Sequence, residues 1–160
     1  MESMHTNQKL HILSKSLEQT LQIGKKIGES LRPGMLVELV GDLGGGKTSL
    51  TKGIAQGLGI TKTITSPTFS IQRSYDLPQG GSLEHFDLYR LEDHDAIKSE
   101  IAEYLQDPNV IVVVEWAKDF ISSLKPDHLV IHFHWLNEHD REMVISATGP
   151  QSQKVLESLS

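Results

Sequence analysis

A glycine-rich segment that ends in lysine and threonine carries the clearest chemical signal in the chain. Residues 41–48 read Gly-Asp-Leu-Gly-Gly-Gly-Lys-Thr, which matches the phosphate-binding pattern G-x-x-x-x-G-K-[ST] at every fixed position. Glycines in such a loop let backbone N–H groups turn inward around phosphate oxygens. Lys47 would then reach the β- and γ-phosphates of a nucleotide, and the Thr48 hydroxyl would bind Mg²⁺. We therefore expect the nucleotide contacts to include Gly41, Asp42, Leu43, Gly44, Gly45, Gly46, Lys47, Thr48 and Ser49.

Phosphoryl chemistry also needs an acidic residue at a strand end, to hold Mg²⁺ or its water shell, and a group that positions the nucleophile. Glu115 directly follows the apolar run 110–114, Asp87 follows a second predicted strand, and Thr68 lies on a hydroxyl-rich loop. Each has a simpler alternative, since Asp87 fits a turn or cap, Glu115 a solvated strand end and Thr68 an ordinary loop. The upstream glycine loop favours the chemical interpretation. The predicted catalytic residues are Lys47, Thr68, Asp87 and Glu115, and the predicted metal ligands are Thr48, Asp87 and Glu115.

The elements that would position these residues alternate between strand and helix, as in an α/β fold. An apolar strand over 35–40 precedes the glycine loop, and a helix over 48–56 follows it. Segments 69–75 and 83–88 flank a Pro-Gln-Gly-Gly turn and predict a β-hairpin. We expect a P-loop NTPase-like three-layer sandwich with a mixed, mainly parallel sheet. The remaining predicted elements are a helix opened by Ser16, helices over 95–105 and 151–158, and strands over 110–114, 129–133 and 143–146.

Length and composition limit the possible functions. The 160 residues are enough for one domain over residues 1–160 with a substantial core. The absence of cysteine excludes disulfides and thiol chemistry. No apolar run approaches the roughly 20 residues of a membrane span, and the polar N-terminus lacks a secretory signal, so we expect a cytoplasmic protein with no membrane contact. The net charge of −6 argues against direct binding of nucleic acid by this chain and favours contact with nucleic acid through a partner protein.

Four blocks of the chain form a recognisable set in order and spacing. They are the glycine loop 41–48, Ser66-Pro67-Thr68-Phe69, His85-Phe86-Asp87-Leu88-Tyr89-Arg90 and Glu115-Trp116. Together they resemble the TsaE (YjeE) family of bacterial P-loop ATPases, and the similarity runs from about residue 13 to residue 147. The resemblance implies an ATP- and Mg²⁺-dependent ATPase required for N6-threonylcarbamoyladenosine at position 37 of tRNAs that read ANN codons. It also implies a TsaD–TsaB-like pair as partner, with the ATPase needed for repeated turnover.

The resemblance also implies individual roles. Lys47 is similar to the phosphate-binding lysine, Thr48 to a Mg²⁺ ligand and Glu115 to the Walker-B-type acid at the metal. Asp87 corresponds to the acid needed for hydrolysis, and Thr68 to a switch residue.

Two further residues carry implied roles near the nucleotide, Trp116 after the acid and Arg141 close to the base or ribose. The chain departs from the family pattern at Gly45, where alanine is frequent. It also departs in Ala117-Lys118-Asp119, which lacks a common glutamate, and in Lys125-Pro126.

Two other function classes stay open from the residues alone. A small-molecule or nucleotide kinase would need several cationic groups to clamp donor and acceptor phosphates, and this chain has four arginines and no arginine-rich lid segment. A nucleotide-sensing module without turnover would not need the Asp87 carboxylate.

Overall fold

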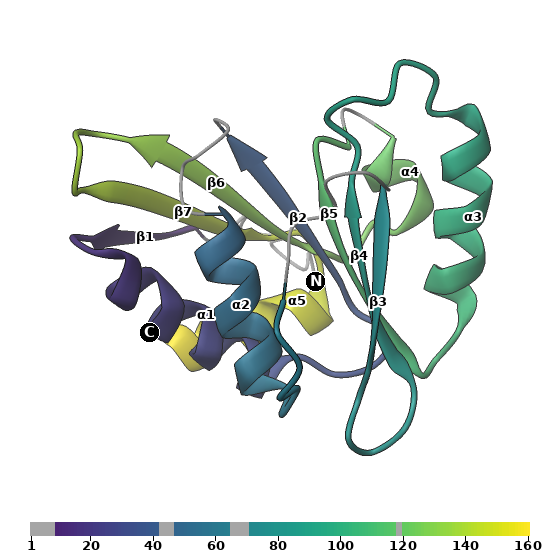
Figure 1. Cartoon of the computed structure of the whole chain (residues 1–160), viewed down its shortest axis with the longest axis horizontal. Helices are drawn as coiled ribbons and strands as arrows, with labels where there is room; N and C mark the ends of the chain where they lie inside the picture. The colour runs from purple at the N-terminus through teal and green to yellow at the C-terminus, as the bar shows by residue number, and fades with distance from the viewer. Residues whose placement is uncertain (1–8, 42–46, 65–70, 118–119) are drawn as a thin grey trace, which may run out of the picture.

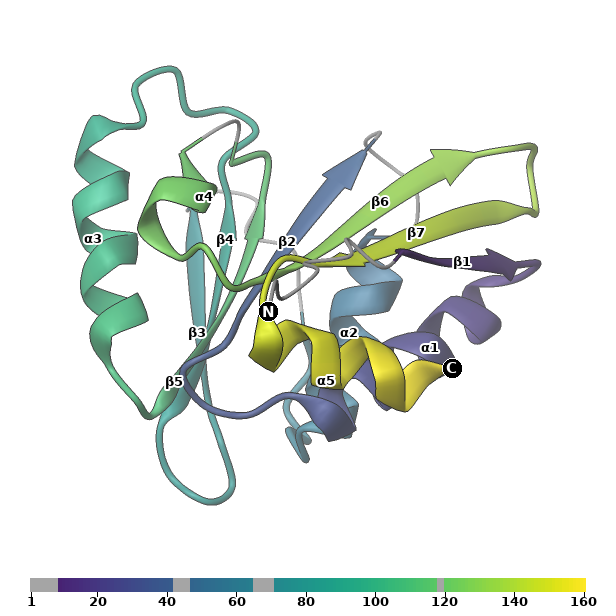
Figure 2. The ribbon, with the colours of Figure 1, turned by 180° about the vertical axis from the view of Figure 1, so that it is seen from behind.

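The computed structural model describes residues 9–41, 47–64, 71–117 and 120–160. They form one mixed sheet of seven strands with helices on both faces (Figure 1; Figure 2 shows the reverse side). The strands are β1 (Lys9–Ser14), β2 (Leu36–Gly41), β3 (Gln72–Asp76), β4 (Ser82–Asp87), β5 (Val110–Glu115), β6 (Leu129–Trp135) and β7 (Arg141–Ala147). The helices are α1 (Leu17–Ser30), α2 (Lys47–Gly57), α3 (Asp95–Gln106), α4 (Ile121–Leu124) and α5 (Pro150–Leu159).

The strand order is β1-β7-β6-β2-β5-β4-β3. The four central strands β6, β2, β5 and β4 run parallel, while β3, β7 and β1 pair antiparallel at the two sides. The expected α/β architecture and the β3–β4 hairpin are confirmed. Because parallel strands end at one edge of a sheet, β2, β5 and β4 bring their following residues together at that edge.

Each face of the sheet has its own apolar core. On one face, α1, α2 and α5 cover side chains such as Val37, Val113 and Ile131 (Figure 1). On the other face, α3 and α4 cover Phe86 and Val114 among others. The continuous apolar run of β5 is buried throughout, as expected for a central parallel strand with helices on both sides.

Helices α1 and α2 pack backbone to backbone through glycines. A Cβ on Gly28 would overlap the carbonyl oxygen of Ile54, and one on Gly53 would overlap that of Leu21. Gly24 and Gly57 leave room in the same way. This contact fixes the position of α2, which begins at Lys47, against α1.

The predicted helix start at Ser16 is confirmed in its local geometry. The Ser16 hydroxyl accepts from the Gln19 backbone N–H at 3.1 Å, while the Gln19 side chain accepts from Lys15 N–H at 2.7 Å. The strand β1 and the short helix α4 were not predicted. Strand β1 is a short edge strand in which only Leu10 and Ile12 pack against the core, and α4 spans one turn, so each offers too short a pattern to predict.

Several predicted boundaries differ by one to three residues from the observed ones, as at β6 and β7, which extend to Trp135 and begin at Arg141. Helix ends and strand ends depend on turns and tertiary contacts rather than on the apolar pattern. Among the described residues, no helix combines the length and apolarity that crossing a membrane requires.

Candidate functional site

Lys47 lies at the start of α2 with its ammonium group turned toward the end of β2. Its Nζ donates to the Gly41 carbonyl oxygen at 3.0 Å and lies 4.3 Å from the centre of the Trp116 ring. The residue is only 4% exposed. A buried lysine beside a strand end and a helix N-terminus is suited to binding a phosphate as a point charge.

Two carboxylates face each other across adjacent strand ends. Asp87, the last residue of β4, is the register partner of Glu115, the last residue of β5. Burial is the main cause that raises the pKa of Asp87 above its ordinary value; the Tyr89 backbone N–H opposes the rise, and the Glu115 charge adds to it. The Lys47 and His85 charges also act on this carboxyl. The structure thus brings three predicted site residues, Lys47, Asp87 and Glu115, into one electrostatic environment.

A histidine that the sequence analysis did not assign holds Glu115. His85 lies on β4 two residues before Asp87, and its Nε2 is 2.8 Å from Glu115 Oε2. Both side chains are almost fully buried. Buried carboxylates are costly unless hydrogen-bonded, so this contact stabilises Glu115 at the site. The signal in the sequence was a histidine at alternate spacing with Asp87, which places both on one face of a strand.

Trp116 has an unusual backbone conformation directly after Glu115. Its φ of 61° lies in the left-handed region, which non-glycine residues rarely adopt. Its ring packs at 5.0 Å from the Tyr89 ring, and among the described residues its buried Nε1 has no hydrogen-bond partner. Strained backbone of this kind concentrates at functional sites. The ring also lies over the Lys47 ammonium group, and the expected role of Trp116 near a nucleotide stays a prediction.

The remaining predicted residues are placed less centrally. Thr48 is exposed and Ser49 half-buried in the first turn of α2. Arg141 begins β7, donates to the carbonyl oxygens of Asn137 and Asp140 at 2.7 and 3.1 Å, and lies over the Trp135 ring at 5.8 Å. Its described side-chain contacts lie within the β6–β7 hairpin, and its backbone also pairs with Ser14 of β1. Asp42, Leu43, Gly44, Gly45, Gly46 and Thr68 lie outside the described residues.

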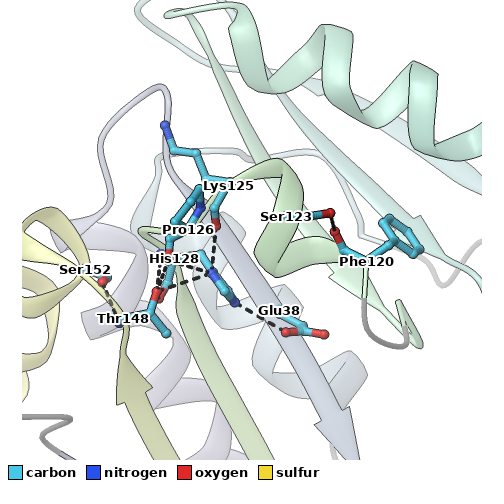
Figure 3. Close-up of polar contacts among 8 residues, drawn as sticks. All are labelled: Glu38, Phe120, Ser123, Lys125, Pro126, His128, Thr148 and Ser152. Carbon is cyan, nitrogen blue, oxygen red and sulfur yellow. Dashed lines mark hydrogen bonds and ion pairs between the residues drawn. The ribbon is translucent and has the colours of Figure 1, made fainter.

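A second buried ion pair involves β2, the strand that leads to the glycine loop. Glu38 of β2 is 9% exposed, and its Oε1 is 3.5 Å from Nε2 of His128 (Figure 3). The other ring nitrogen of His128, Nδ1, donates to the Lys125 carbonyl oxygen at 2.9 Å. Burial acts to lower the pKa of His128, but the Glu38 carboxylate and the Lys125 carbonyl outweigh it and raise the pKa above its usual value.

Comparison with known proteins gives the same result at the level of sequence and of structure. The family model described as threonylcarbamoyl adenosine biosynthesis protein TsaE matches residues 14–143. The chain belongs to the TsaE family. A relative from Bacillus subtilis (strain 168), a tRNA threonylcarbamoyladenosine biosynthesis protein TsaE, is 38% identical over 146 residues and 89% of each chain.

Further relatives agree with this assignment. A TsaE protein of Mycobacterium bovis is 35% identical over 140 residues, covering 83% of each chain. The crystal structure of Bacillus subtilis YdiB superposes with a TM-score of 0.78 at 33% identity, covering 97% of this chain and 96% of that one. The fold and the family resemblance inferred from the sequence are therefore confirmed, and the family is one of tRNA threonylcarbamoyladenosine biosynthesis.

The residues of this TsaE family member fit a nucleotide-bound Mg²⁺ rather than an all-protein metal site. Among the described residues, no group of three or more His, Cys, Asp or Glu side chains is arranged to hold a metal ion. Asp87 and Glu115 face each other, and burial together with the Glu115 charge raises the pKa of Asp87. A bound cation would reduce the repulsion between the two carboxylates. Because Mg²⁺ is commonly held by one or two carboxylates together with substrate phosphates, Asp87, Glu115 and the Thr48 hydroxyl fit that donor set.

Proposed function

We propose that this TsaE family member binds ATP together with Mg²⁺ and hydrolyses it to support repeated formation of N6-threonylcarbamoyladenosine at A37 of ANN-decoding tRNAs. One observation carries the proposal: Asp87 and Glu115 face each other in register at the ends of β4 and β5, in the same electrostatic environment as the buried Lys47. A lysine for the phosphates and acids for the metal and the water are the parts that phosphoryl transfer to water requires.

Each side chain has a distinct role in the proposal. Lys47 binds the β- and γ-phosphates, and Thr48 with Glu115 or Asp87 holds the Mg²⁺, whose charge neutralises the phosphate oxygens when it is bound. His85 keeps Glu115 oriented through the 2.8 Å contact. Asp87 orients the attacking water and accepts its proton, for which a carboxyl of raised pKa is suited because it lies closer to the working pH.

A TsaD–TsaB-like pair is the proposed partner, and the site of action is the cytoplasm. A net charge of −6 makes direct binding of tRNA by this chain unfavourable, because neutralisation of phosphates by Lys and Arg supplies most non-specific affinity. In this proposal the tRNA is reached through the pair. The β3–β4 hairpin ends at Asp87 and pairs with β5, so a partner resting on it would sense the nucleotide state.

The decisive experiment measures ATP hydrolysis by the chain alone, by the pair alone and by the three proteins together. We expect slow hydrolysis alone and faster hydrolysis with the pair, with phosphate release that does not depend on an added phosphoryl acceptor. Capture of the pair by the chain should be stronger with a non-hydrolysable ATP analogue than without nucleotide. Dependence on an acceptor would favour the kinase alternative, and tight tRNA binding by the isolated chain at physiological salt would contradict the indirect route.

A further inference from the structure

A cavity of about 480 Å³ adjoins the Lys47 environment on the α3 side of the sheet. Gly41 and Trp116, the two residues that Lys47 contacts, belong to its wall, and Leu88, Leu91 and Ala117 form apolar sides. The volume is in the range of pockets that hold a small molecule or an inserted side chain. The described residues that line it include no lysine or arginine.

The cavity carries negative charge instead. Glu38 lines it with a nearly buried carboxylate, and Glu92 lines it with an exposed one. His128 approaches only Oε1 of Glu38, at 3.5 Å, and the second carboxylate oxygen is turned away from the imidazole (Figure 3). Glu38 is 9% exposed and borders the cavity, so a ligand in the cavity can reach its carboxylate. A largely desolvated carboxylate favours a hydrogen-bonding cation as its partner.

Two aromatic rings complete the lining. Tyr89 and Trp116 both border the cavity, with their ring centres 5.0 Å apart and their planes tilted by 57°. Tyr89 is 53% exposed, which is high for a side chain that borders a cavity. Aromatic faces beside a carboxylate form the environment that recognises organic cations, because the ring quadrupole and the anion attract the same charge.

We propose that this cavity receives the guanidinium group of an arginine side chain from a partner protein. A planar guanidinium can stack on Tyr89 or Trp116 while it donates to the Glu38 carboxylate, and a lysine ammonium lacks that combination. The arginine comes from another protein, because none of the four arginines of this chain lines the cavity. The overall charge of −6 favours a cationic partner surface.

The identity of the partner protein in this inference rests on the proposed function. Gly41 and Trp116 both border the cavity and contact Lys47, so an arginine bound there would lie next to the proposed nucleotide site. The partner that the proposed function names, a TsaD–TsaB-like pair, would supply it. The geometry of the cavity can nevertheless be tested without any ATP turnover.

The direct test uses the full chain with Trp135→Phe, which leaves Trp116 as the sole tryptophan. N-acetyl-arginine methylamide is titrated while Trp116 fluorescence and its indole N–H resonance are followed, with N-acetyl-citrulline methylamide as the neutral isostere. We expect saturable shifts with the arginine compound, and an affinity about tenfold lower in Glu38→Gln, which loses the charge-assisted contact. Glu84→Gln, a change at another buried glutamate that instead accepts from Gln72 and Ser74, should leave the affinity unchanged.

Other outcomes overturn the proposal. Equal shifts with the citrulline compound, or equal affinity in the Glu38→Gln protein, would show that the carboxylate does not recognise a cation there. Tighter binding of spermidine than of the arginine compound would assign the cavity to a free polyamine. Tyr89→Ala, a change at an exposed side chain, provides a second variant if Glu38→Gln does not fold, and it should weaken binding of the arginine compound through lost stacking.

Measurements with the partner pair separate the two proposals. We expect Glu38→Gln to reduce the stimulation of ATP hydrolysis by the pair while the unstimulated rate is unchanged. If the pair fails to stimulate the wild-type chain but the arginine compound still binds at Trp116, the proposed function is wrong and the cavity assignment stands. If stimulation is normal in both Glu38→Gln and Tyr89→Ala, the cavity assignment is wrong and the proposed function stands.

Discussion

His85 Nε2 lies 2.8 Å from Glu115 Oε2 in the interior between β4 and β5, so the acid that follows the central strand is held by a neighbour rather than solvated. The contact joins two strands whose last residues, Asp87 and Glu115, form the acidic part of the site. It makes the position of Glu115 depend on β4 as well as on β5. The position of a solvated acid at the end of β5 would depend on β5 alone.

Removal of the imidazole should therefore destabilise the chain. His85→Leu leaves a buried carboxylate without this partner, which typically costs about 3 kcal/mol or more of the free energy of unfolding. His85→Gln keeps a side-chain donor and should recover much of that loss. Urea unfolding measures both, and the Mg²⁺ concentration for half-maximal hydrolysis should rise more in His85→Leu. Equal stability of wild type and His85→Leu would refute the role given to this pair.

The affinity for ATP should depend on Lys47. Lys47→Ala removes a charge-assisted contact to the phosphates, which costs about 1.5–3 kcal/mol of binding free energy. Lys52→Ala is the matched control, because Lys52 is exposed on the same helix. Calorimetry of ATP binding measures both variants. Unchanged affinity in a folded Lys47→Ala protein would show that the phosphate site lies elsewhere.

We expect the Asp87 carboxylate to be needed for ATP hydrolysis and to lower the free energy of unfolding at neutral pH. We expect Asp87→Asn to cut ATP hydrolysis at least tenfold, about 1.4 kcal/mol in the barrier, while ADP binding is largely kept. Because the folded chain raises the pKa of Asp87, chiefly by burial, the folded state favours the protonated form, and ionisation at neutral pH opposes folding. Asp87→Asn should therefore raise the melting temperature at pH 7.

The stabilisation of the fold that we predict for Asp87→Asn should depend on pH. The stabilisation by Asp87→Asn should vanish as pH falls below the ordinary carboxyl pKa, where Asp87 is protonated in both states. Asp76→Asn, at an exposed strand end, is the control and should change neither turnover nor melting. A full hydrolysis rate in Asp87→Asn would remove Asp87 from the mechanism.

The parts of the fold that follow from local pattern were predictable from the sequence. The apolar run of β5, the strand–loop–helix around Lys47 and the β3–β4 hairpin each have a period or a turn signal within about ten residues. Strand β1 has a weaker signal, since only Leu10 and Ile12 alternate toward the core and the strand is positioned by pairing with β7.

The same limit applies to the site. Lys47, Asp87 and Glu115 were predicted because a motif or a strand end marks them, whereas the polar pairs around them depend on contacts between distant segments. Glu38 could have been noticed as the single charged residue in the apolar segment 35–40. Its partner His128 could not, because only the folded sheet brings the two together.

The glycine contact between α1 and α2 gives a prediction that links packing to nucleotide binding. Alanine is usually favoured over glycine in a helix by about 1 kcal/mol. At Gly28, however, a methyl group would overlap the Ile54 carbonyl oxygen, so the helices must separate. We expect Gly28→Ala to lower the free energy of unfolding by about 1–3 kcal/mol and to weaken ATP binding through Lys47. Lys26→Ala, at an exposed position of α1, should have little effect on either. A more stable Gly28→Ala protein would show that the helices separate freely.

The last prediction concerns Asp127, which caps α5 from outside the helix. Its Oδ2 accepts from the Gln151 N–H at 2.8 Å, and its Oδ1 accepts from the Ser152 N–H at 3.0 Å and hydroxyl at 2.7 Å. Desolvation acts to raise the pKa of Asp127, but these hydrogen bonds outweigh it and lower the pKa. A carboxyl with a lowered folded pKa stabilises the fold above its ordinary pKa, and this contribution is lost as pH falls through the lowered value.

Asp127→Asn should therefore melt below wild type at pH 7, by a loss of about 1 kcal/mol typical of a helix cap. The difference should begin to shrink below about pH 4, the ordinary carboxyl pKa, and disappear as pH falls through the lowered pKa of folded Asp127. Thermal melts of both proteins between neutral and acid pH test this, with Glu157→Gln on the exposed side of α5 as the control. A difference that stays constant across that range would mean that the charge of Asp127 does not contribute, and that its hydrogen-bond geometry alone caps the helix.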